Sequence, residues 1–219
     1  MSKGRGIAKT LLVASRNAKK LAELQRLLDA AGITGIDLVS LRDVPEFPEA
    51  PETGETFEQN ALAKARDAVA ATGLASVADD SGLEIDALHG MPGVLSARWS
   101  GTHGDDAANT ALVVAQLRDV PDERRSAAFV SACALVLPDG TETVERGTWR
   151  GAIAHEARGE GGFGYDPVFV PLVGEDPVHP VLADRTAAEL SPQEKDAVSH
   201  RGRALARLLP SIAAWAAST

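Results

Sequence analysis

The sequence predicts an α/β protein with a mixed sheet. In the first half, short apolar runs of strand length alternate with stretches of helical periodicity, and a strand–turn–strand pattern follows later. This order is typical of helices packed on a sheet that contains more than one kind of strand pair. A length of 219 residues suits one substantial domain or one domain with two lobes.

The first 41 residues predict a strand, a helix and a second strand. Residues 10–15 have the pattern of a buried strand, and Asn17 is placed to cap the helix that follows. Apolar residues recur in that helix at helical spacing: Leu21, Leu24, Leu28 and Ala31. Gly32 is expected to end the helix, and residues 36–41 predict the second strand.

A loop rich in proline and glutamate leads into a second predicted helix, over residues 57–72. One apolar stripe runs along it: Phe57, Ala61, Ala65 and Val69. Gly73 is expected to stop this helix. Two separate strands should then follow, over residues 75–78 and residues 83–88, with a pair of aspartates at the end of the first.

The second half predicts a helix, a hairpin and a terminal helix. The first helix covers about residues 105–117, and residues 127–137 form a long strand pattern. The single cysteine, Cys133, has apolar neighbours in that strand and is expected to be buried. Pro138-Asp-Gly140 predicts the turn into a strand over residues 141–149, and the last helix covers about residues 199–217.

Charge and hydropathy exclude several classes of function. The formal net charge of −9 argues against a general nucleic-acid binder, which usually carries a basic patch. The basic start MSKGRGIAK is not followed by a long apolar stretch, and the longest apolar run is too short to span a bilayer. We therefore expect a cytoplasmic protein that binds neither nucleic acid nor membrane.

Five short segments carry side chains suited to chemistry, and the first is Ser15-Arg-Asn17-Ala-Lys-Lys20. Free N–H groups at a helix N-terminus attract phosphate, and Ser15, Asn17 and Lys20 would add donors around it. A strand, a helix cap and exposed lysines explain the same residues without any function. The pattern GxxxxGK[ST] is absent, so the segment is not a Walker A loop.

The second segment is Glu52-Thr-Gly-Glu55, followed on the next helix by Asn60 and Lys64. Asn60 and Lys64 are four residues apart and therefore share a helix face. In a functional interpretation one glutamate ligates a metal, while Asn60 and Lys64 point at the same anionic substrate. The alternative is an acidic loop beside a solvated helix face.

The third segment has Asp79 and Asp80 side by side after a buried strand, followed by Ser81. Adjacent like charges oppose each other's ionisation, so the pair is costly unless something compensates it. A metal ion does so, and Mg²⁺ prefers one or two carboxylates together with substrate phosphates and water. An Asx-type turn at the strand end is the alternative. Ser81 lacks the GxSxG surroundings of a nucleophile.

The fourth segment is a glycine-rich loop, Gly159-Glu-Gly-Gly-Phe-Gly-Tyr-Asp-Pro167. It matches GxGxxG, but a strand does not precede it and a helix does not follow it, so we reject a dinucleotide site. What remains is a loop that presents Phe163 and Tyr165 for stacking on a base, with Asp166 nearby.

The fifth segment begins at Ser191, which forms a capping-box pattern with Glu194 and so indicates a helix start. Beyond it, Lys195, His200 and Arg201 are three donors close together in an otherwise acidic chain. Such residues are usually on the surface, so the segment has a structural explanation as well as a functional one.

In their order, these segments resemble the inosine triphosphate pyrophosphatase family. The matching motifs are Ser-x-Asn-x-x-Lys, Glu-Thr-Gly…Asn-Ala-x-x-Lys-Ala, Ala-Asp-Asp-Ser-Gly-Leu, Pro-Gly-x-x-Ser-Ala-Arg, Gly-Gly-Phe-Gly-Tyr-Asp-Pro and Ser-His-Arg-Gly, over roughly residues 11–209. The resemblance implies an elongated α/β fold with a strongly twisted sheet flanked by helices, and two lobes with an active-site cleft between them. We expect residues 1–9 to be a flexible extension and residues 10–219 to form one two-lobed domain.

The resemblance also implies an activity. The chain would be a Mg²⁺-dependent homodimeric hydrolase that cleaves dITP/ITP and XTP/dXTP at the α–β phosphate bond and so cleans the nucleotide pool. The substrate-binding positions would be Ser15, Asn17, Lys20, Lys64 and Ser81. The metal-binding acids would be Glu52 and Asp80, and Asp80 would also accept the proton of the attacking water. The base-contacting loop would be Phe163, Gly164, Tyr165 and Asp166, and the purine edge would be read by Lys195, His200 and Arg201.

Some features are left without a role. Asp79 is either catalytic or structural. Arg185 stands where a lysine is usual in the family, which keeps the charge but changes its geometry. The loop over residues 171–184 is longer than typical. Cationic donors would donate to the 6-oxo group of hypoxanthine and disfavour the 6-amino group of adenine. The sequence indicates no residue that excludes the 2-amino group of guanine.

Two other functions fit some of the motifs. A Mg²⁺ phosphatase of the haloacid dehalogenase type would need Asp-x-Asp-x-Thr, which Asp79-Asp-Ser-Gly does not match. A nucleotide-binding regulator would keep Lys20, Lys64 and Phe163 but would not need the acids Glu52, Asp79 and Asp80.

Overall fold

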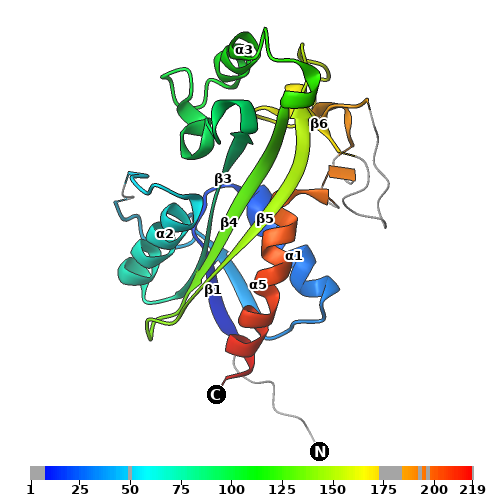
Figure 1. Ribbon diagram of the computed structural model, residues 1–219. Helices are drawn as coiled ribbons and strands as arrows, with labels where there is room; N and C mark the ends of the chain where they lie inside the picture. The colour runs from blue at the N-terminus through cyan, green and yellow to red at the C-terminus, as the bar shows by residue number, and fades with distance from the viewer. Residues whose placement is uncertain (1–7, 49–50, 173–183, 192–193, 196–197, 219) are drawn as a thin grey trace, which may run out of the picture. The chain divides into compact units, whose positions relative to one another are not determined.

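A computed structural model of the chain describes residues 8–48, 51–172, 184–191, 194–195 and 198–218. In this part of the chain, strands form a sheet in the order β2-β1-β3-β4-β5-β6 (Figure 1). The strands are β1 (Lys9–Val13), β2 (Ile36–Ser40), β3 (Ala75–Ile85), β4 (Ser126–Val136), β5 (Glu142–Ile153) and β6 (Phe169–Pro171). The helices are α1 (Ala18–Ala30), α2 (Phe57–Thr72), α3 (Asp106–Gln116) and α5 (His200–Ala217), and short 3₁₀ turns cover Asp86–Leu88, Gly93–Arg98, Asp122–Arg124, Asp166–Val168 and Ala187–Glu189.

The sheet is mixed, as predicted. β1 pairs in parallel with both β2 and β3, whereas β5 pairs antiparallel with β6. At the predicted hairpin turn, the Leu137 N–H donates to the Thr141 carbonyl at 2.9 Å, and Gly140 adopts a φ of 88°. Only glycine enters this left-handed region without strain, so the Pro-Asp-Gly turn between β4 and β5 is confirmed.

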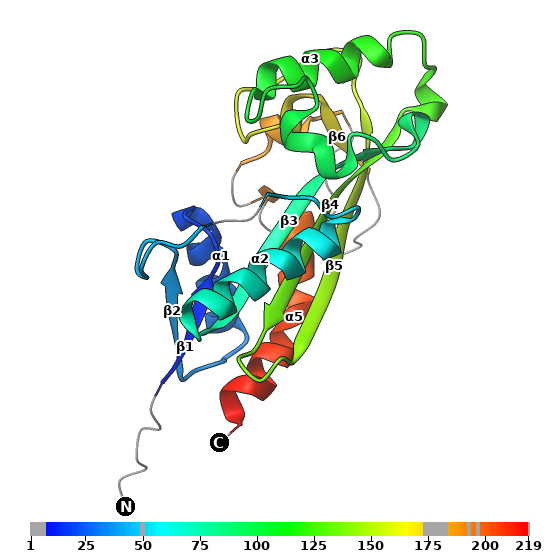
Figure 2. The ribbon, with the colours of Figure 1, turned by 90° about the vertical axis from the view of Figure 1, so that its left-hand side faces the viewer.

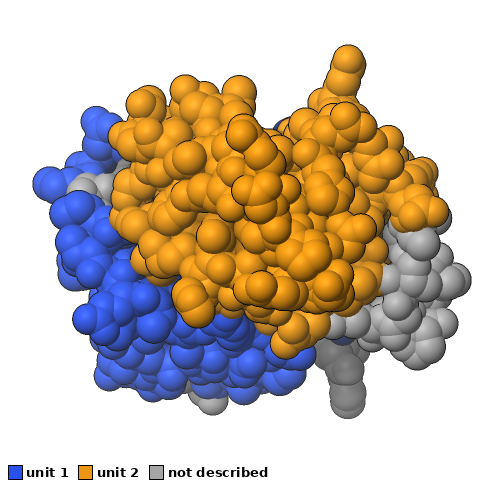
Figure 3. All heavy atoms as spheres, turned by 45° about the horizontal axis from the view of Figure 1, so that its top comes forward, with its two compact units in different colours: residues 1–80, 132–146, 204–219 blue, residues 81–131, 147–203 orange. Residues whose placement is uncertain are grey.

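The chain divides into two compact units (Figure 3). Unit 1 comprises residues 1–80, 132–146 and 204–219, and unit 2 comprises residues 81–131 and 147–203. Each unit contains its own cluster of buried apolar side chains. Within the described residues, no helix is both long and apolar enough to cross a membrane.

In unit 1, α1 and α5 pack on one face of the sheet. Their buried side chains meet alternate residues of β1, β3 and β4 in one cluster: Leu11, Val13, Leu24, Leu28, Ala75, Val77, Cys133, Leu135, Ala204, Leu205, Leu208 and Ile212. Helix α2 lies on the opposite face (Figure 2) and buries Phe57, Ala61, Ala65 and Ala68. Gly73 ends α2 at a φ of 70°, and Cys133 is fully buried, both as predicted.

The prediction of two separate strands around the aspartate pair is wrong. β3 runs without interruption from Ala75 to Ile85 and carries Asp79 and Asp80 in its interior, and a 3₁₀ turn replaces the strand expected over residues 86–88. Successive side chains of a strand point to opposite faces. Each aspartate therefore faces a different helix, and each meets a lysine there. Because each aspartate has a lysine partner, the two negative charges do not prevent a continuous strand.

The ends of the first elements differ from the prediction by a residue or two. β1 begins at Lys9 rather than residue 10, and β2 ends at Ser40. Asn17 caps α1 as predicted, because its Oδ1 accepts the N–H of Lys19 at 3.0 Å. Residues 1–7 of the predicted extension, and residues 173–183 of the loop after β6, lie outside the described residues.

In unit 2, α3 packs on the core that β4 and β5 share with β6. The rings of Phe129 and Phe169 have centroids 4.5 Å apart, and Trp149 lies 5.2 Å from Phe169. Beside this cluster Arg125 is 2% exposed and donates to the carbonyls of Leu117, Val120, Ile153 and Ala154. Arg125 therefore joins the segment after α3 to the end of β5, which fixes the position of α3.

Candidate active site

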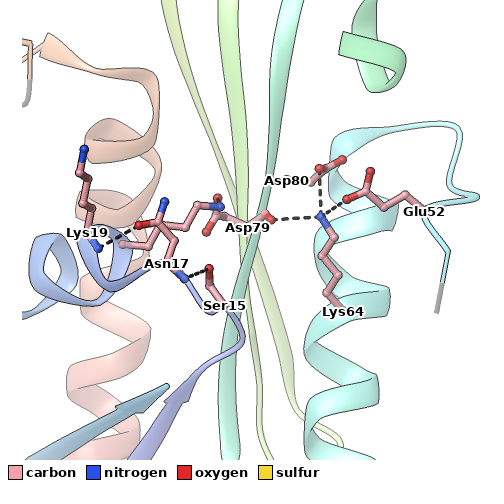
Figure 4. A network of polar contacts seen from close by, with 8 residues as sticks. Ser15, Asn17, Lys19, Glu52, Lys64, Asp79 and Asp80 are labelled. Atoms are coloured by element: carbon pink, nitrogen blue, oxygen red, sulfur yellow. Dashed lines mark hydrogen bonds and ion pairs between the residues drawn. The ribbon is translucent and has the colours of Figure 1, made fainter. Parts of the chain in front are cut away.

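The aspartate pair of β3 lies in unit 1, and Figure 4 shows Lys64 beside Asp80 and Glu52. On the α1 side, Lys20 Nζ lies 2.6 Å from Asp79 Oδ2. On the α2 side, Lys64 Nζ lies 3.1 Å from Asp80 Oδ1 and 2.6 Å from Glu52 Oε1. The structure thus brings the predicted metal-binding acids together with both predicted phosphate-binding lysines.

The start of α1 contributes two further predicted residues. The Oγ of Ser15 accepts the N–H of Asn17 at 3.1 Å, and Asn17 in turn caps the helix. Both side chains therefore hold the turn between β1 and α1, beside Lys20. Helix N–H groups that point outward at such a turn are suited to bind phosphate.

Asn60 orders the α2 side of the cluster. Its side chain is 2% exposed, accepts the N–H of Gly54 at 2.8 Å and donates to Asp80 Oδ2 at 3.0 Å. A Cβ at residue 54 would lie 2.6 Å from Asn60 Oδ1, so only glycine allows this close approach. The sequence suggested that Asn60 points at the substrate; instead it joins the Glu52 loop to Asp80.

Two carboxylates of this cluster lie close to each other. Glu52 and Asp80 both contact the ammonium group of Lys64. Burial raises the pKa of Asp80, and Glu52 adds to the rise, against the opposing effects of Lys64 and Asn60. Burial alone would lower the pKa of Lys64, but the charges of Asp80 and Glu52 outweigh it and raise that pKa.

This donor set fits Mg²⁺. Among the described residues, no group of three His, Cys, Asp or Glu side chains forms a protein-only metal site. Mg²⁺ needs no such group, because it is usually held by one or two carboxylates with phosphate oxygens and water. Glu52 and Asp80 already converge on one cation, the Lys64 ammonium, and two neighbouring carboxylates favour a bound cation.

A cavity of about 390 Å³ in unit 1 opens beside these residues. The residues of its wall include Ser15, Lys20, Glu52, Asn60, Lys64 and Asp79. Asn17 is exposed at the start of α1, and Ser81 is exposed on β3 immediately after Asp80. The cavity can therefore admit a polyanion between cationic groups from both faces of the sheet.

The glycine-rich loop lies in unit 2 and exposes one aromatic ring. Phe163 is 73% exposed, and Lys195 Nζ lies 4.6 Å from the centroid of its ring. Lys195 also forms an ion pair with Asp166, which is 2% exposed and accepts the N–H of Phe163 at 2.8 Å. An exposed ring with a cation beside it is suited to stack on a base.

Tyr165 is placed differently from its prediction. It is 4% exposed, and its hydroxyl donates to the Ser96 carbonyl at 2.7 Å. Burial, with a further contribution from Asp106, raises the pKa of this phenol well above its ordinary value. The predicted stacking role of Tyr165 is therefore wrong, since its ring belongs to the core of unit 2.

His200 and Arg201 begin α5 and are 9% and 8% exposed. The His200 ring stacks on Phe129, with centroids 5.1 Å apart and an interplanar angle of 16°. Arg185, the residue that differs from the usual lysine, donates to Glu194 Oε1 at 2.7 Å. Glu194 also accepts the Ser191 N–H at 2.7 Å, which confirms the predicted capping contact.

The prediction from sequence missed residues that hold these groups from a distance. Ser96 accepts the Leu83 N–H on its hydroxyl and the Tyr165 hydroxyl on its carbonyl. Asp106, at the start of α3, accepts the N–H of Gly164. The motif Pro-Gly-x-x-Ser-Ala-Arg was a signal for Ser96, whereas no pattern distinguished Asp106 from the surface acids around it.

Comparison with known proteins decides the family. The family model described as the Ham1 family matches residues 11–211. The chain belongs to the Ham1 family. A dITP/XTP pyrophosphatase of Mycolicibacterium paratuberculosis is 73% identical to it over 202 residues, which are 92% of this chain and 95% of that protein.

Solved structures of the Ham1 family have the same fold. The crystal structure of a nucleoside-triphosphatase/dITP/XTP pyrophosphatase from Mycobacterium abscessus superposes with a TM-score of 0.77 at 66% identity, over 93% of this chain and 99% of that one. A HAM1 protein from Coxiella burnetii gives a TM-score of 0.79 at 42% identity, over 93% and 98% of the two chains. The resemblance to the inosine triphosphate pyrophosphatase family is confirmed.

Proposed function

We propose that this chain hydrolyses non-standard purine nucleoside triphosphates, dITP/ITP and XTP/dXTP, to the nucleoside monophosphate and pyrophosphate. The observation that carries the proposal is near full-length similarity to several proteins named dITP/XTP pyrophosphatase. The proposal includes a dependence on Mg²⁺, a homodimeric assembly and a cytoplasmic location, which is where nucleoside triphosphates are made and used.

The triphosphate binds at the start of α1 and between the two lysines. Lys20 and Lys64 neutralise Asp79 and Asp80 in the free protein, at 2.6 and 3.1 Å. When a polyanion enters, the same ammonium groups turn to its phosphate oxygens. The positive end of the α1 dipole, beside Asn17, adds charge stabilisation at little reorganisation cost.

Asp80 accepts the proton of the attacking water. Burial raises the pKa of its carboxyl, which makes the carboxylate a stronger base than an exposed aspartate. Asn60 donates to Oδ2 and so fixes the orientation of the carboxylate. Glu52 and Asp80 would hold Mg²⁺, which when bound supplies neutralisation of the charge on the leaving pyrophosphate.

The purine is recognised by residues of unit 2. Phe163 stacks on the base, and Lys195, which contacts the Phe163 ring in the free protein, would donate to the 6-oxo group. His200 and Arg201 would add donors at the start of α5. The 6-amino group of adenine is itself a hydrogen-bond donor and could not accept from these side chains. We therefore expect dATP to be a poor substrate.

One assay tests the proposal. The protein is incubated with dITP, dGTP or dATP in the presence of Mg²⁺ or EDTA, and the products are identified by chromatography. We expect dIMP and pyrophosphate from dITP with Mg²⁺, and little product from the other two. Orthophosphate with dIDP would identify a phosphatase instead, and no turnover of any nucleotide would favour a regulator.

A further inference from the structure

The glycine-rich loop of unit 2 is held by side chains at two consecutive amides. Asp166 Oδ2 accepts the N–H of Phe163 at 2.8 Å. Asp106 Oδ2 accepts the N–H of the next residue, Gly164, at 2.7 Å. The carbonyl of Gly164 accepts the hydroxyl of Thr110 at 3.3 Å. Both polar backbone groups of Gly164 are thus bound by side chains of α3.

These contacts matter because the loop has a conformation that it would not keep alone. Gly159, Gly162 and Gly164 have φ angles of 84°, 78° and 60°, and glycine is the residue whose unfolded and alternative states are most numerous. A Cβ at residue 162 would overlap Asp166 Oδ2. Ordering so many glycines costs conformational entropy that specific hydrogen bonds must offset.

The residue between the two anchored amides is the exposed aromatic ring. Phe163 is 73% exposed, so packing of its own ring does little to fix its direction. Its backbone N–H is held by Asp166, and the next N–H by Asp106. Together the two carboxylates fix the peptide groups on both sides of the Phe163 Cα, and thereby the direction of its side chain.

We propose that Asp106 is a positioning residue that presents Phe163 to the base of the substrate. This inference rests on the proposed function and extends it to α3, a helix that carries none of the residues expected to touch the nucleotide. Asp106 is exposed on the first turn of α3, where a carboxylate is favoured by the helix dipole. It acts through the Gly164 N–H, which its carboxylate accepts.

The test separates base recognition from phosphate chemistry. In Asp106→Ala, the KM for dITP should rise about 5- to 10-fold, a part of the usual stacking contribution of a base. The kcat should stay within about twofold, because the phosphate site is untouched. Inorganic tripolyphosphate, which has no base, should inhibit wild type and variant with the same constant.

Two control variants are measured beside Asp106→Ala. Asp106→Asn keeps an oxygen that can accept the Gly164 N–H and should restore a KM near that of wild type. Asp119→Ala removes an exposed carboxylate a few residues beyond α3 and should leave the KM unchanged. Hydrogen exchange of peptides that contain residues 163 and 164 should be faster in Asp106→Ala only.

Each outcome supports or overturns the proposed positioning role of Asp106. A KM in Asp106→Ala within about twofold of wild type, or a tripolyphosphate constant that rises as much as the KM, would overturn the proposal. Absence of wild-type turnover would count against the proposed function alone. Hydrogen exchange and the affinity for dIMP, both measured without turnover, would then decide the role of Asp106: unchanged exchange and affinity in Asp106→Ala would overturn it.

Discussion

Replacement of Asp80 by asparagine should stabilise the metal-free protein and sharply reduce turnover. Two carboxylates, Glu52 and Asp80, contact the same ammonium group of Lys64, so their negative charges lie close together. Burial raises the pKa of Asp80, as expected of a carboxylate whose charged form the fold disfavours. Asparagine removes that charge and keeps an oxygen for the hydrogen bond from Asn60.

The expected gain in unfolding free energy follows from removal of the Asp80 charge. Neutralising a destabilised functional group typically gains about 0.5–2 kcal/mol of unfolding free energy. For a chain of this length each kcal/mol raises the Tm by about 2–4 °C. Turnover of dITP should fall by about 10²- to 10⁴-fold, which is the contribution of a positioned general base.

Thermal unfolding in EDTA and in millimolar Mg²⁺, together with pyrophosphate release from dITP, measures both effects. Asp80→Asn should melt above wild type in EDTA, and Mg²⁺ should narrow or reverse this difference in Tm, because under the proposed function it binds the wild-type acids. Asp119→Asn makes the same charge change at an exposed position and serves as control. A variant that melts well below wild type in EDTA would refute the charge argument. Turnover close to the wild-type rate would remove Asp80 from its catalytic role.

Three further substitutions or titrations test other contacts. Lys20→Ala should lower kcat/KM for dITP about 10- to 100-fold through loss of a charge-assisted hydrogen bond to phosphate. Unchanged kinetics would contradict this role of Lys20. The variant should also be less stable in urea unfolding, because buried Asp79 loses its ion pair with Lys20. Gly82→Ala should lower the free energy of unfolding in urea by about 1–3 kcal/mol, because a Cβ at residue 82 would lie 2.7 Å from the carbonyl oxygen of Gly93. An unchanged urea midpoint would show that the 3₁₀ turn at Gly93–Arg98 shifts easily to admit the Cβ. Tyr165, the single tyrosine, has a pKa raised above 10.0 by burial. Its contribution to stability is full below the unfolded pKa and is lost as pH rises above it, since the unfolded chain then ionises first. Ultraviolet titration should therefore show the phenol ionising only with alkaline unfolding, and a transition near its ordinary pKa in the folded protein would contradict its burial.

The helices were predictable because their signals are local. α2 has the predicted bounds, Phe57–Thr72, because an apolar stripe defines its buried face and Gly73 at a φ of 70° ends it. Asn17 caps α1 through a contact two residues away. Such features depend on neighbours in sequence, so propensity and spacing reveal them.

The course of β3 was not predictable for the opposite reason. Asp-Asp-Ser-Gly has the local chemistry of a turn, and only partners distant in the chain override it. Lys20 is separated from Asp79 by 59 residues, and Lys64 from Asp80 by 16. Asp106 is likewise 58 residues from Gly164. A single sequence carries no signal for these pairings, although the family motifs identified most of the residues that take part.

The continuous strand explains why two aspartates stand side by side. Had the chain turned after Asp79, both carboxylates would lie close together and oppose each other's ionisation. In an extended strand they point to opposite faces of the sheet, where Lys20 of α1 and Lys64 of α2 each neutralise one of them. Because Asp79 and Asp80 are adjacent, their partners Lys20 and Lys64 approach the same point of β3 from opposite faces of the sheet. A triphosphate that binds there would replace both carboxylates as partner of the lysines in one event, and would release Asp80, together with Glu52, for the metal and the water.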